Sequence, residues 1–246
     1  MDETDFRAQR LFLDSDLADG VAVATSREQA NYLLNVLRLE SGDRVLVFNG
    51  RDGEWLAEIN RHGRRDASLV PRRRTRAQNH GPDIHYLFAP LKRSRLDYMV
   101  QKATELGVAH LAPVITRRTV AERVNLERMR ANVIEAAEQC GVLRIPSIAE
   151  PLPLEKALSG WAGERHLIFC DEGAEIADPV AALRKMGEGP AALLIGPEGG
   201  FDPAERDRLL ALPFVTRISL GPRIMRADTA AVAALALLNA VVGDWR

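Results

Sequence analysis

Apolar runs and amphipathic segments alternate along residues 84–242, and this alternation predicts a mainly parallel α/β sheet. Strands are expected at 85–89, 109–115, 145–149, 166–170, 191–195 and 215–220. Helices are expected at 95–106, 125–140, 178–186 and 230–242, with a helical turn at 154–158 and a further helix starting after Asp202. Asp202 and the proline behind it form an N-cap, and Asp228 or Thr229 is expected to cap the final helix.

Residues 1–76 follow a different pattern, with strand candidates at short intervals around one helix: 10–13, 21–24, 44–49, 54–59 and 67–72. Ser26 and Gln29 complete a capping box, and helical spacing of apolar residues predicts a helix that ends near Ser41-Gly42. Asp52-Gly53 predicts the hairpin turn. The unit is interpreted as a small β-barrel. The polar segment 75–82 is interpreted as a linker, which gives domains at 1–76 and 77–246.

Two similar sequence units follow one another near the C-terminus. Each is an apolar run, 191–195 or 215–220, that stops at Gly-Pro. Both strands are expected to be parallel and to end side by side, so that the loops 196–201 and 221–226 form a crevice where open α/β sheets bind ligands. Gly196–Gly200 either presents backbone amides to a ligand or forms a plain tight turn. Spacing alone leaves both interpretations open.

The side chains of these loops suggest a binding site rather than a hydrolytic one. Glu198 is placed to accept from a ribose hydroxyl or a base, or to cap a helix. Arg223 and Arg226 favour an anionic or electron-rich substrate group. Ile224 and Met225 form either an apolar wall for a planar ring or core plugs under the loop. No phosphate-loop motif, Ser/His/Asp set or paired carboxylates stand out, so hydrolysis and metal chemistry are disfavoured.

Composition limits the class of protein and its cellular compartment. The chain is 46% hydrophobic and 27% charged, an ordinary globular composition, and no apolar window reaches the ~18 residues of a membrane span. Two distant cysteines and an acidic N-terminus (Asp2, Glu3, Asp5) suggest a reducing cytoplasm without a signal peptide, a disulfide or a zinc site. The final helix, 230–242, is hydrophobic on nearly all sides, which predicts burial in the core or in a subunit interface.

Charge is distributed unevenly although the net charge is only −1. Seven arginines fall within the sixteen residues 61–76. Such a stretch either holds phosphates or is a solvated basic linker, and the sequence pattern leaves both interpretations open.

Several segments together resemble one known family. The loops 193–201 (LLIGPEGGF) and 220–230 (LGPRIMRADTA) are similar to the two signature loops of the 16S rRNA (uracil-N3)-methyltransferases, the RsmE family of the SPOUT class. The runs 91–97 (LKRSRLD), 101–108 (QKATELGV), 138–141 (EQCG) and 32–42 (YLLNVLRLESG) resemble further blocks of that family. The chain departs from the usual family pattern at Val142, Ala227 and Asp228.

The resemblance implies a SPOUT-type, trefoil-knotted, mainly parallel α/β sheet with a small N-terminal PUA-like β-barrel. The periodicity itself carries no sign of a knot. The resemblance also implies a cytoplasmic homodimer without metal or membrane attachment, which uses S-adenosylmethionine to methylate N3 of one uridine in 16S rRNA of the small ribosomal subunit. The alternatives are a SPOUT methyltransferase acting on another RNA site, and a non-catalytic RNA-binding or ribosome-assembly factor.

The same resemblance suggests roles for individual residues. Arg226 is expected to stabilise charge on the uracil carbonyl oxygens, and Asp228 or Glu198 to take the N3 proton. The residues expected to hold the cofactor are Leu194, Ile195, Gly196, Glu198, Gly199, Gly200, Leu220, Gly221, Ile224 and Met225. The residues expected to hold RNA are Arg38, Arg64, Arg65, Arg72, Arg73, Arg74, Arg93, Arg95 and Arg223.

Overall fold

The computed structural model describes residues 9–120, 123–175, 178–187 and 189–245, so the acidic positions Asp2, Glu3 and Asp5 lie outside the described residues. Contacts divide the chain into two units. Unit 1 is Met1–Asn79 with Ala137–Ile145, and unit 2 is His80–Ala136 with Pro146–Arg246. Residues 137–145 therefore belong with the N-terminal unit, although they are distant from it in sequence.

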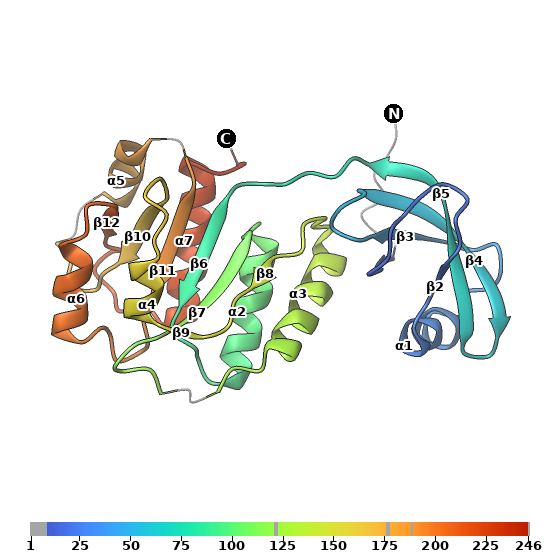
Figure 1. Ribbon diagram of the computed structural model, residues 1–246, viewed down its shortest axis with the longest axis horizontal. Helices are drawn as coiled ribbons and strands as arrows, with labels where there is room; N and C mark the ends of the chain where they lie inside the picture. Colours follow the sequence, from blue (N-terminus) through green and yellow to red (C-terminus); the bar gives the residue numbers. More distant parts are fainter. Residues whose placement is uncertain (1–8, 121–122, 176–177, 188, 246) are drawn as a thin grey trace. The chain divides into compact units, whose positions relative to one another are not determined.

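Unit 1 is built on a five-stranded sheet with the strand order β1-β3-β4-β5-β2 (Figure 1). The strands are β1 (Arg10–Phe12), β2 (Val23–Ala24), β3 (Arg44–Phe48), β4 (Glu54–Gly63) and β5 (Asp66–Arg76). β1 pairs with β3 in parallel, and the other pairs are antiparallel. Side chains from this sheet and from the helix α1 (Arg27–Asn31) form one apolar core that includes Leu33, Val47, Ile59 and Leu69.

The predicted capping box at Ser26 and Gln29 is confirmed, but the predicted helix length is wrong. α1 passes into a π-helical turn, η1 (Tyr32–Val36), and the helical segment ends at Leu37 rather than near Ser41. Arg38 has a φ of 59°, and the backbone N–H of Leu39 returns to the carbonyl of Leu33 at 3.0 Å. This left-handed residue stops the helix because continued helix needs a negative φ.

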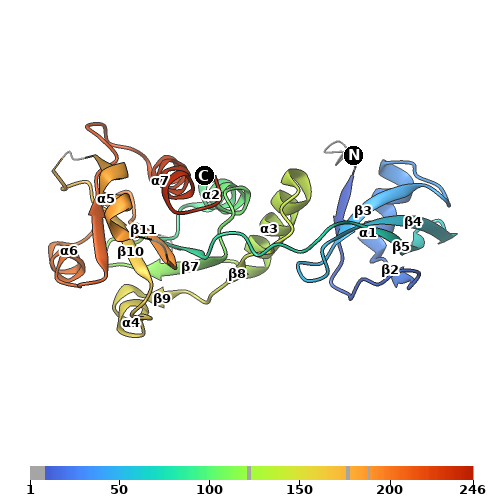
Figure 2. The ribbon, with the colours of Figure 1, turned by 90° about the horizontal axis from the view of Figure 1, so that it is seen from above.

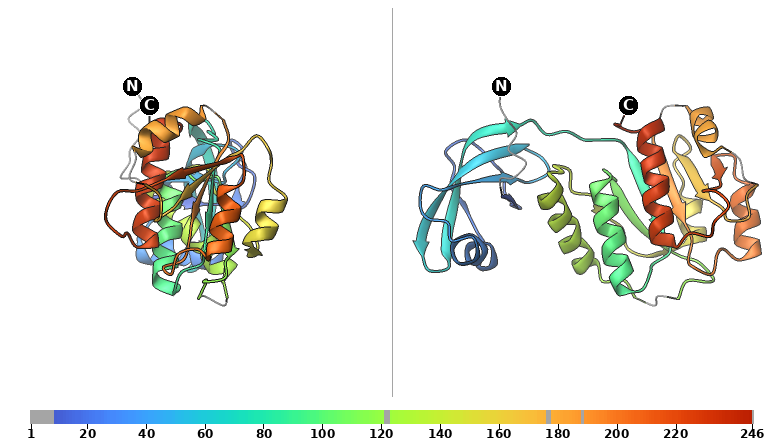
Figure 3. Two further views of the ribbon diagram at one scale, coloured as in Figure 1. Left: turned by 90° about the vertical axis from the view of Figure 1, so that its left-hand side faces the viewer. Right: turned by 180° about the vertical axis from the view of Figure 1, so that it is seen from behind.

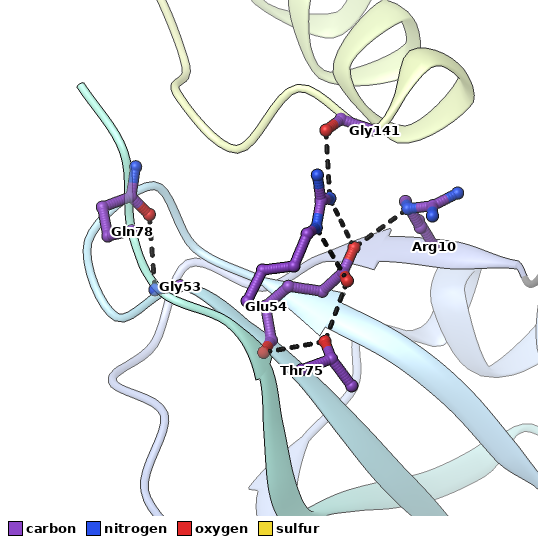
Figure 4. A network of polar contacts seen from close by, with 7 residues as sticks. Arg10, Gly53, Glu54, Thr75, Gln78 and Gly141 are labelled. Atoms are coloured by element: carbon purple, nitrogen blue, oxygen red, sulfur yellow. Dashed lines mark hydrogen bonds and ion pairs between the residues drawn. The ribbon is translucent and has the colours of Figure 1, made fainter. Parts of the chain in front are cut away.

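The predicted start of the linker is also wrong, because Thr75 and Arg76 are still part of β5. Both residues bind Glu54, whose side chain is fully buried (Figure 4). The Glu54 carboxylate accepts from Arg10 Nε at 3.0 Å, from Arg76 Nη2 at 2.6 Å and from Thr75 Oγ1 at 2.8 Å. Burial alone raises the pKa of Glu54, but the hydrogen bonds from Arg76, Thr75 and Arg10 outweigh it and hold that pKa below its ordinary value.

The Glu54 network also fixes the segment 137–145 within unit 1. Arg76 Nη2 donates to the carbonyl of Gly141 at 3.0 Å (Figure 4), and the backbone N–H of Phe12 donates to Glu138 Oε1 at 2.8 Å. One buried carboxylate thus connects three parts of the chain that are far apart in sequence.

Unit 2 has a parallel sheet with the order β12-β10-β11-β6-β7-β8, and β9 pairs with β7. Every pair in it is parallel, as the alternation of strands and helices predicts. In chain order the elements are β6 (Ile84–Phe88), α2 (Arg93–Glu105), β7 (His110–Ile115), α3 (Leu126–Cys140), β8 (Ser147–Ile148), β9 (Leu152–Pro153), α4 (Leu154–Ser159), β10 (His166–Cys170), α5 (Pro179–Met186), β11 (Ala191–Ile195), α6 (Pro203–Leu210), β12 (Val215–Ile218) and α7 (Ala227–Val241). The last turn of α3 falls in unit 1.

Helices cover both faces of this sheet. α2 and α7 pack together on one face, and α4 lies on the other (Figures 2 and 3). Successive strand residues point to opposite faces of the sheet. Leu87, Phe169 and Leu194 pack toward α4 and α6. On the other face, Tyr86 Oη donates to Met99 Sδ of α2 at 2.9 Å. The capping box that starts α6 at Asp202 is confirmed.

The expected cap of the final helix is wrong. The N-cap of α7 is Arg226, which has an extended backbone and makes no side-chain cap bond. Asp228 instead accepts from the adjacent N–H of Thr229 at 2.8 Å, inside the first turn. Ala231, Ala234, Leu235 and Leu238 are buried on one side of α7, and the residues between them are mostly half-buried.

Protonation of His110, the first residue of β7, is expected to make the stability of unit 2 depend on pH. The rings of His85 and His110 lie 4.8 Å apart, and His110 Nδ1 lies 2.8 Å from Ser147 Oγ. Burial, followed by the charge of Arg165, lowers the pKa of His110. Since the folded-state pKa lies below the unfolded value of about 6.5, the stabilisation is complete above that pH and is lost as the pH falls through the folded-state pKa.

We therefore expect the free energy of unfolding of the wild-type protein to fall more steeply below about pH 6.5 than that of His110→Gln. Urea titrations at pH 7.5, 6.5 and 5.5 measure the difference, with the exposed His80→Gln as the matched control. Parallel pH profiles for the wild type and His110→Gln would contradict this prediction.

Candidate functional site

A pocket of about 300 Å³ lies in unit 2, where the loops after β10, β11 and β12 meet. These loops leave the carboxyl ends of three adjacent parallel strands, the usual place for a ligand in an open α/β sheet. The expectation that the two Gly-Pro strands end side by side is wrong, because β10 lies between β11 and β12 and pairs with both. The pocket therefore has a third wall, made by residues 170–173.

The loop after β11 is shaped by close approaches that only glycine allows. Gly200 has a φ of 69°, and its N–H closes a turn onto the carbonyl of Pro197 at 2.9 Å. Gly196 lies against the ring of Phe201, which itself meets Phe169 edge-on at 5.1 Å. The glycines thus form a tight turn, and this turn is also part of the pocket wall.

Replacing Gly196 by alanine is expected to destabilise the protein by about 1–3 kcal/mol, the usual cost of overpacking. A methyl group at this position would lie 2.5 Å from Cε2 of Phe201, a partly buried ring that packs against the core and meets Phe169 edge-on. Thermal unfolding measures the effect. The matched control is Gly199→Ala, whose methyl group would meet Arg118 Cβ at an ordinary 3.8 Å. Equal melting temperatures for the two variants would contradict the prediction.

The loop after β12 forms the opposite wall of the pocket. The hydroxyl of Ser219 accepts from the N–H of Gly221 at 3.3 Å, and Gly221 has a φ of 100°. Ile224 is 96% exposed, so the interpretation of this residue as a core plug is wrong. Met225 is half-buried and lines the pocket with it.

The structure brings together most of the residues expected to hold a cofactor. Those that line the pocket are Ile195, Gly196, Glu198, Gly200, Leu220, Gly221, Ile224 and Met225. Leu194 is buried inside β11 and Gly199 is exposed, and neither contributes to the pocket wall. Arg226 and Asp228 also lie outside the wall, although their neighbours Met225 and Ala227 line it.

Arginines from the first turn of α2 and from the loop after β7 contact the Gly-rich turn and the start of α6. Arg95 Nη1 pairs with Glu198 Oε1 at 3.1 Å, and both side chains are partly exposed. Arg118 Nη1 donates to the carbonyl of Gly199 at 2.8 Å, and Arg117 Nη1 donates to Asp202 Oδ1 at 2.9 Å. Arg93, in the first turn of α2, and Arg223 and Arg226, which follow β12, are exposed. This half of the site therefore carries the positive charge that a polyanion requires.

Sequence reasoning missed the wall that follows β10. Asp171 is buried and accepts from Arg206 Nε at 3.0 Å, from Arg206 Nη2 at 2.9 Å and from the N–H of Gly173 at 3.0 Å. The hydrogen bonds that Arg206 donates to Asp171 raise the pKa of Arg206, and burial raises the pKa of the Cys170 thiol. A signal was present, because the apolar run 166–170 stops at Asp-Glu-Gly just as the other two stop at Gly-Pro.

The expected RNA-binding arginines of unit 1 are all exposed: Arg38, Arg64, Arg65, Arg72, Arg73 and Arg74. Residues 61–76 are not a linker, since they form the end of β4, a turn at Arg64-Arg65 and all of β5. Asn35 Nδ2 donates to the carbonyl of Arg64 at 3.3 Å, which brings the end of the helical segment to this turn. The basic stretch is thus part of a paired β-hairpin, and Arg76 at its end is bound to the buried Glu54.

Among residues 9–120, 123–175, 178–187 and 189–245, no group of three or more His, Cys, Asp or Glu side chains is arranged to hold a metal ion. None of the helices in the described part of the chain is long and apolar enough to cross a membrane.

Comparison with known proteins defines the class of the chain. An RNA methyltransferase domain matches residues 78–239, and an RNA methyltransferase PUA domain matches residues 25–71. The ribosomal RNA small subunit methyltransferase E of Rickettsia conorii is 30% identical over 92% of this chain and 93% of its own length. The corresponding protein of Synechocystis is 32% identical over 96% of this chain and 78% of its own length. The chain belongs to the ribosomal RNA small subunit methyltransferase E family.

Solved structures agree with this placement. The family member from Neisseria gonorrhoeae, bound to S-adenosylmethionine, matches 97% of this chain and 100% of its own at a TM-score of 0.83 and 25% identity. A methyltransferase from Legionella pneumophila with the same bound cofactor matches 97% of this chain and 99% of its own, at 0.84 and 31% identity. The expected fold class, a mainly parallel SPOUT-type α/β sheet with a PUA-like N-terminal domain, is confirmed.

Proposed function

We propose that this protein transfers the methyl group of S-adenosylmethionine to N3 of a single uridine in 16S rRNA of the small ribosomal subunit. The observation that carries the proposal is the pocket at the ends of β12, β10 and β11, in a chain whose structural relatives bind S-adenosylmethionine. The relatives from Rickettsia conorii and Synechocystis are named as methyltransferases of small-subunit ribosomal RNA.

The residues of the pocket fit this cofactor. Ile195, Ile218 and Leu220 provide an apolar surface for an adenine ring, and the glycine loops expose backbone next to it. A volume of about 300 Å³ falls in the range of small-molecule sites. The cofactor supplies an electrophilic methyl group, and the chain supplies binding, orientation and charge stabilisation.

Uracil N3 carries an imide proton that has to leave, and the flanking carbonyl oxygens gain negative charge as it does. Arg226 is exposed between two pocket-lining residues and is the proposed group that stabilises this charge. The proposed proton acceptor is Asp228 rather than Glu198. Glu198 is paired with Arg95 at 3.1 Å, so its carboxylate is already engaged by a side chain of the protein.

Domain organisation and assembly are part of the same proposal. Residues 1–76 form a PUA-like RNA-binding domain, and residues 77–246 form the catalytic domain with a trefoil knot, from which the segment 137–145 packs with the N-terminal unit. The exposed arginines of each domain contact RNA phosphates. The half-buried apolar side of α7 forms the contact between two copies in a cytoplasmic homodimer. The target uridine is unpaired or flipped out, because N3 lies on its base-pairing edge.

The experiment that tests the proposal uses S-adenosylmethionine with a labelled methyl group. The purified protein is incubated with small subunits that lack the modification and, separately, with naked 16S rRNA. Label in RNA supports the proposal, and the comparison shows whether assembled RNA is required. No label transfer together with no cofactor binding by calorimetry would contradict the proposal and favour a non-catalytic RNA-binding or assembly factor.

A further inference from the structure

Three carboxylates line the pocket, and two of them already have partners. Asp171 is bound by Arg206, and Glu198 is bound by Arg95. Glu172 makes no hydrogen bond or ion pair with any residue in the part of the chain that the structure describes. It is therefore the pocket carboxylate whose acceptor atoms are available to a ligand.

The position of Glu172 is defined by its two neighbours. Asp171 accepts from the N–H of Gly173 at 3.0 Å, and Arg206 Nη2 donates to the carbonyl of Gly173 at 3.3 Å. The same Arg206 holds the buried Asp171 with two further hydrogen bonds. The backbone of Glu172 is thus fixed by the hydrogen bonds of the residues on either side. Less conformational entropy is therefore lost when its side chain binds a ligand.

The Glu172 carboxylate lies directly against the Gly-rich loop across the pocket. A methyl group at Gly200 would collide with Glu172 Oε1, so the glycine leaves the space in which this carboxylate lies. Glu172 lies in the loop after β10, the middle strand of the three that build the site, and Gly200 lies in the loop after β11. A ligand held by the loop backbone therefore comes within reach of the carboxylate.

From this geometry we infer that Glu172 is a cofactor-binding residue that accepts hydrogen bonds from the ribose hydroxyls of S-adenosylmethionine. The inference rests on the proposed function. A carboxylate accepts two hydrogen bonds from a diol, and acidic side chains that follow a strand of an open α/β sheet perform this task in nucleotide sites. The reactive end of the cofactor has to face RNA, on the side of the exposed Arg223 and Arg226, which leaves the ribose for the β10 loop.

Calorimetry with three ligands tests the inference: S-adenosylmethionine, S-adenosylhomocysteine and 5′-methylthioadenosine. All three contain the ribose, only the first carries the sulfonium charge, and the third lacks the amino-acid part. We expect Glu172→Ala to raise the Kd of all three by a common factor of about 10 to 100, since a hydrogen bond to a charged group is lost. Glu172→Gln, which keeps one acceptor oxygen, is expected to show a smaller loss.

Glu175→Ala is the matched control, because Glu175 is exposed in the same loop and does not line the pocket. Its Kd values are expected to equal those of the wild type. The melting temperature of Glu172→Ala is also expected to be unchanged, since the side chain has no partner in the described part of the protein.

The other outcomes overturn the assignment in distinguishable ways. Unchanged Kd values for Glu172→Ala would show that Glu172 does not contribute to cofactor binding. Weaker binding of S-adenosylmethionine and S-adenosylhomocysteine, with unchanged binding of 5′-methylthioadenosine, would show that Glu172 contacts the ammonium group of the amino-acid part. Weaker binding of S-adenosylmethionine alone would show that Glu172 contacts the sulfonium. If the wild-type protein bound none of the three ligands, the proposed function itself would fail.

Discussion

Replacing Arg226 by alanine is expected to lower kcat by about 100-fold to 1000-fold, the usual effect of removing one group that stabilises a developing oxyanion. The Kd for S-adenosylmethionine is expected to stay within about threefold of the wild-type value, because the Arg226 side chain does not line the pocket. Single-turnover methyl transfer measures the rate constant, and calorimetry measures the Kd.

The structure separates this effect from unfolding. Arg226 is the N-cap of α7 but makes no side-chain cap bond, and its backbone carbonyl, which accepts from Ala230 at 2.8 Å, is retained in alanine. The melting temperature should therefore not change. Arg223→Ala is the matched control: it removes an exposed arginine of the same loop, and it is expected to weaken RNA binding with little change in kcat. An Arg226→Ala protein that methylates at the wild-type rate would refute the catalytic assignment.

Replacing Glu54 by alanine is expected to reduce the free energy of unfolding by about 3–5 kcal/mol, the cost of removing one partner from a buried ion pair. The buried Arg10, whose side chain is 2% exposed, would lose the carboxylate that binds its Nε, and Thr75 and Arg76 would lose an acceptor. Because Arg76 also holds the carbonyl of Gly141, the attachment of residues 137–145 to unit 1 would weaken.

Urea denaturation measures this loss, and Glu58→Ala is the matched control. Glu58 pairs with Arg72 at the surface of the same sheet, where an ion pair contributes less than about 1 kcal/mol. Since the pKa of Glu54 is lowered, its stabilisation is present above the ordinary pKa of about 4.3 and is lost as the pH falls through the folded-state value. Equal stability of Glu54→Ala and Glu58→Ala would contradict the account of this network.

The parts of the fold that local signals specify were predicted well. The capping boxes at Ser26 and Asp202, the hairpin turn before Glu54 and most strands of the parallel sheet depend on neighbouring residues, and they lie at or close to the predicted positions. The short strand β9 was not predicted. The early end of the first helix was missed, because Arg38 has no local preference for the left-handed conformation that it adopts.

The candidate site was predicted from the sequence only in part, for a topological reason. The loops after β11 and β12 are predicted from the sequence, because each apolar run ends at Gly-Pro. The position of β10 between these two strands depends on strand order, which no local pattern encodes. Asp171, Glu172 and Arg206 were therefore missed. The ion pair of Arg76 with the buried Glu54 was not predicted either. The two residues lie on neighbouring strands, and nothing in the sequence distinguishes Glu54 from a surface carboxylate.

The most direct test of the central claim is the identity of the methylated nucleoside. Small subunits that lack the modification are incubated with the protein and labelled S-adenosylmethionine, and the RNA is digested and analysed by liquid chromatography and mass spectrometry. We expect N3-methyluridine at one position, formed about 100-fold to 1000-fold more slowly by Arg226→Ala. Label in a different nucleoside, or spread over many positions, would contradict the claim that this pocket serves the methylation of one uracil N3.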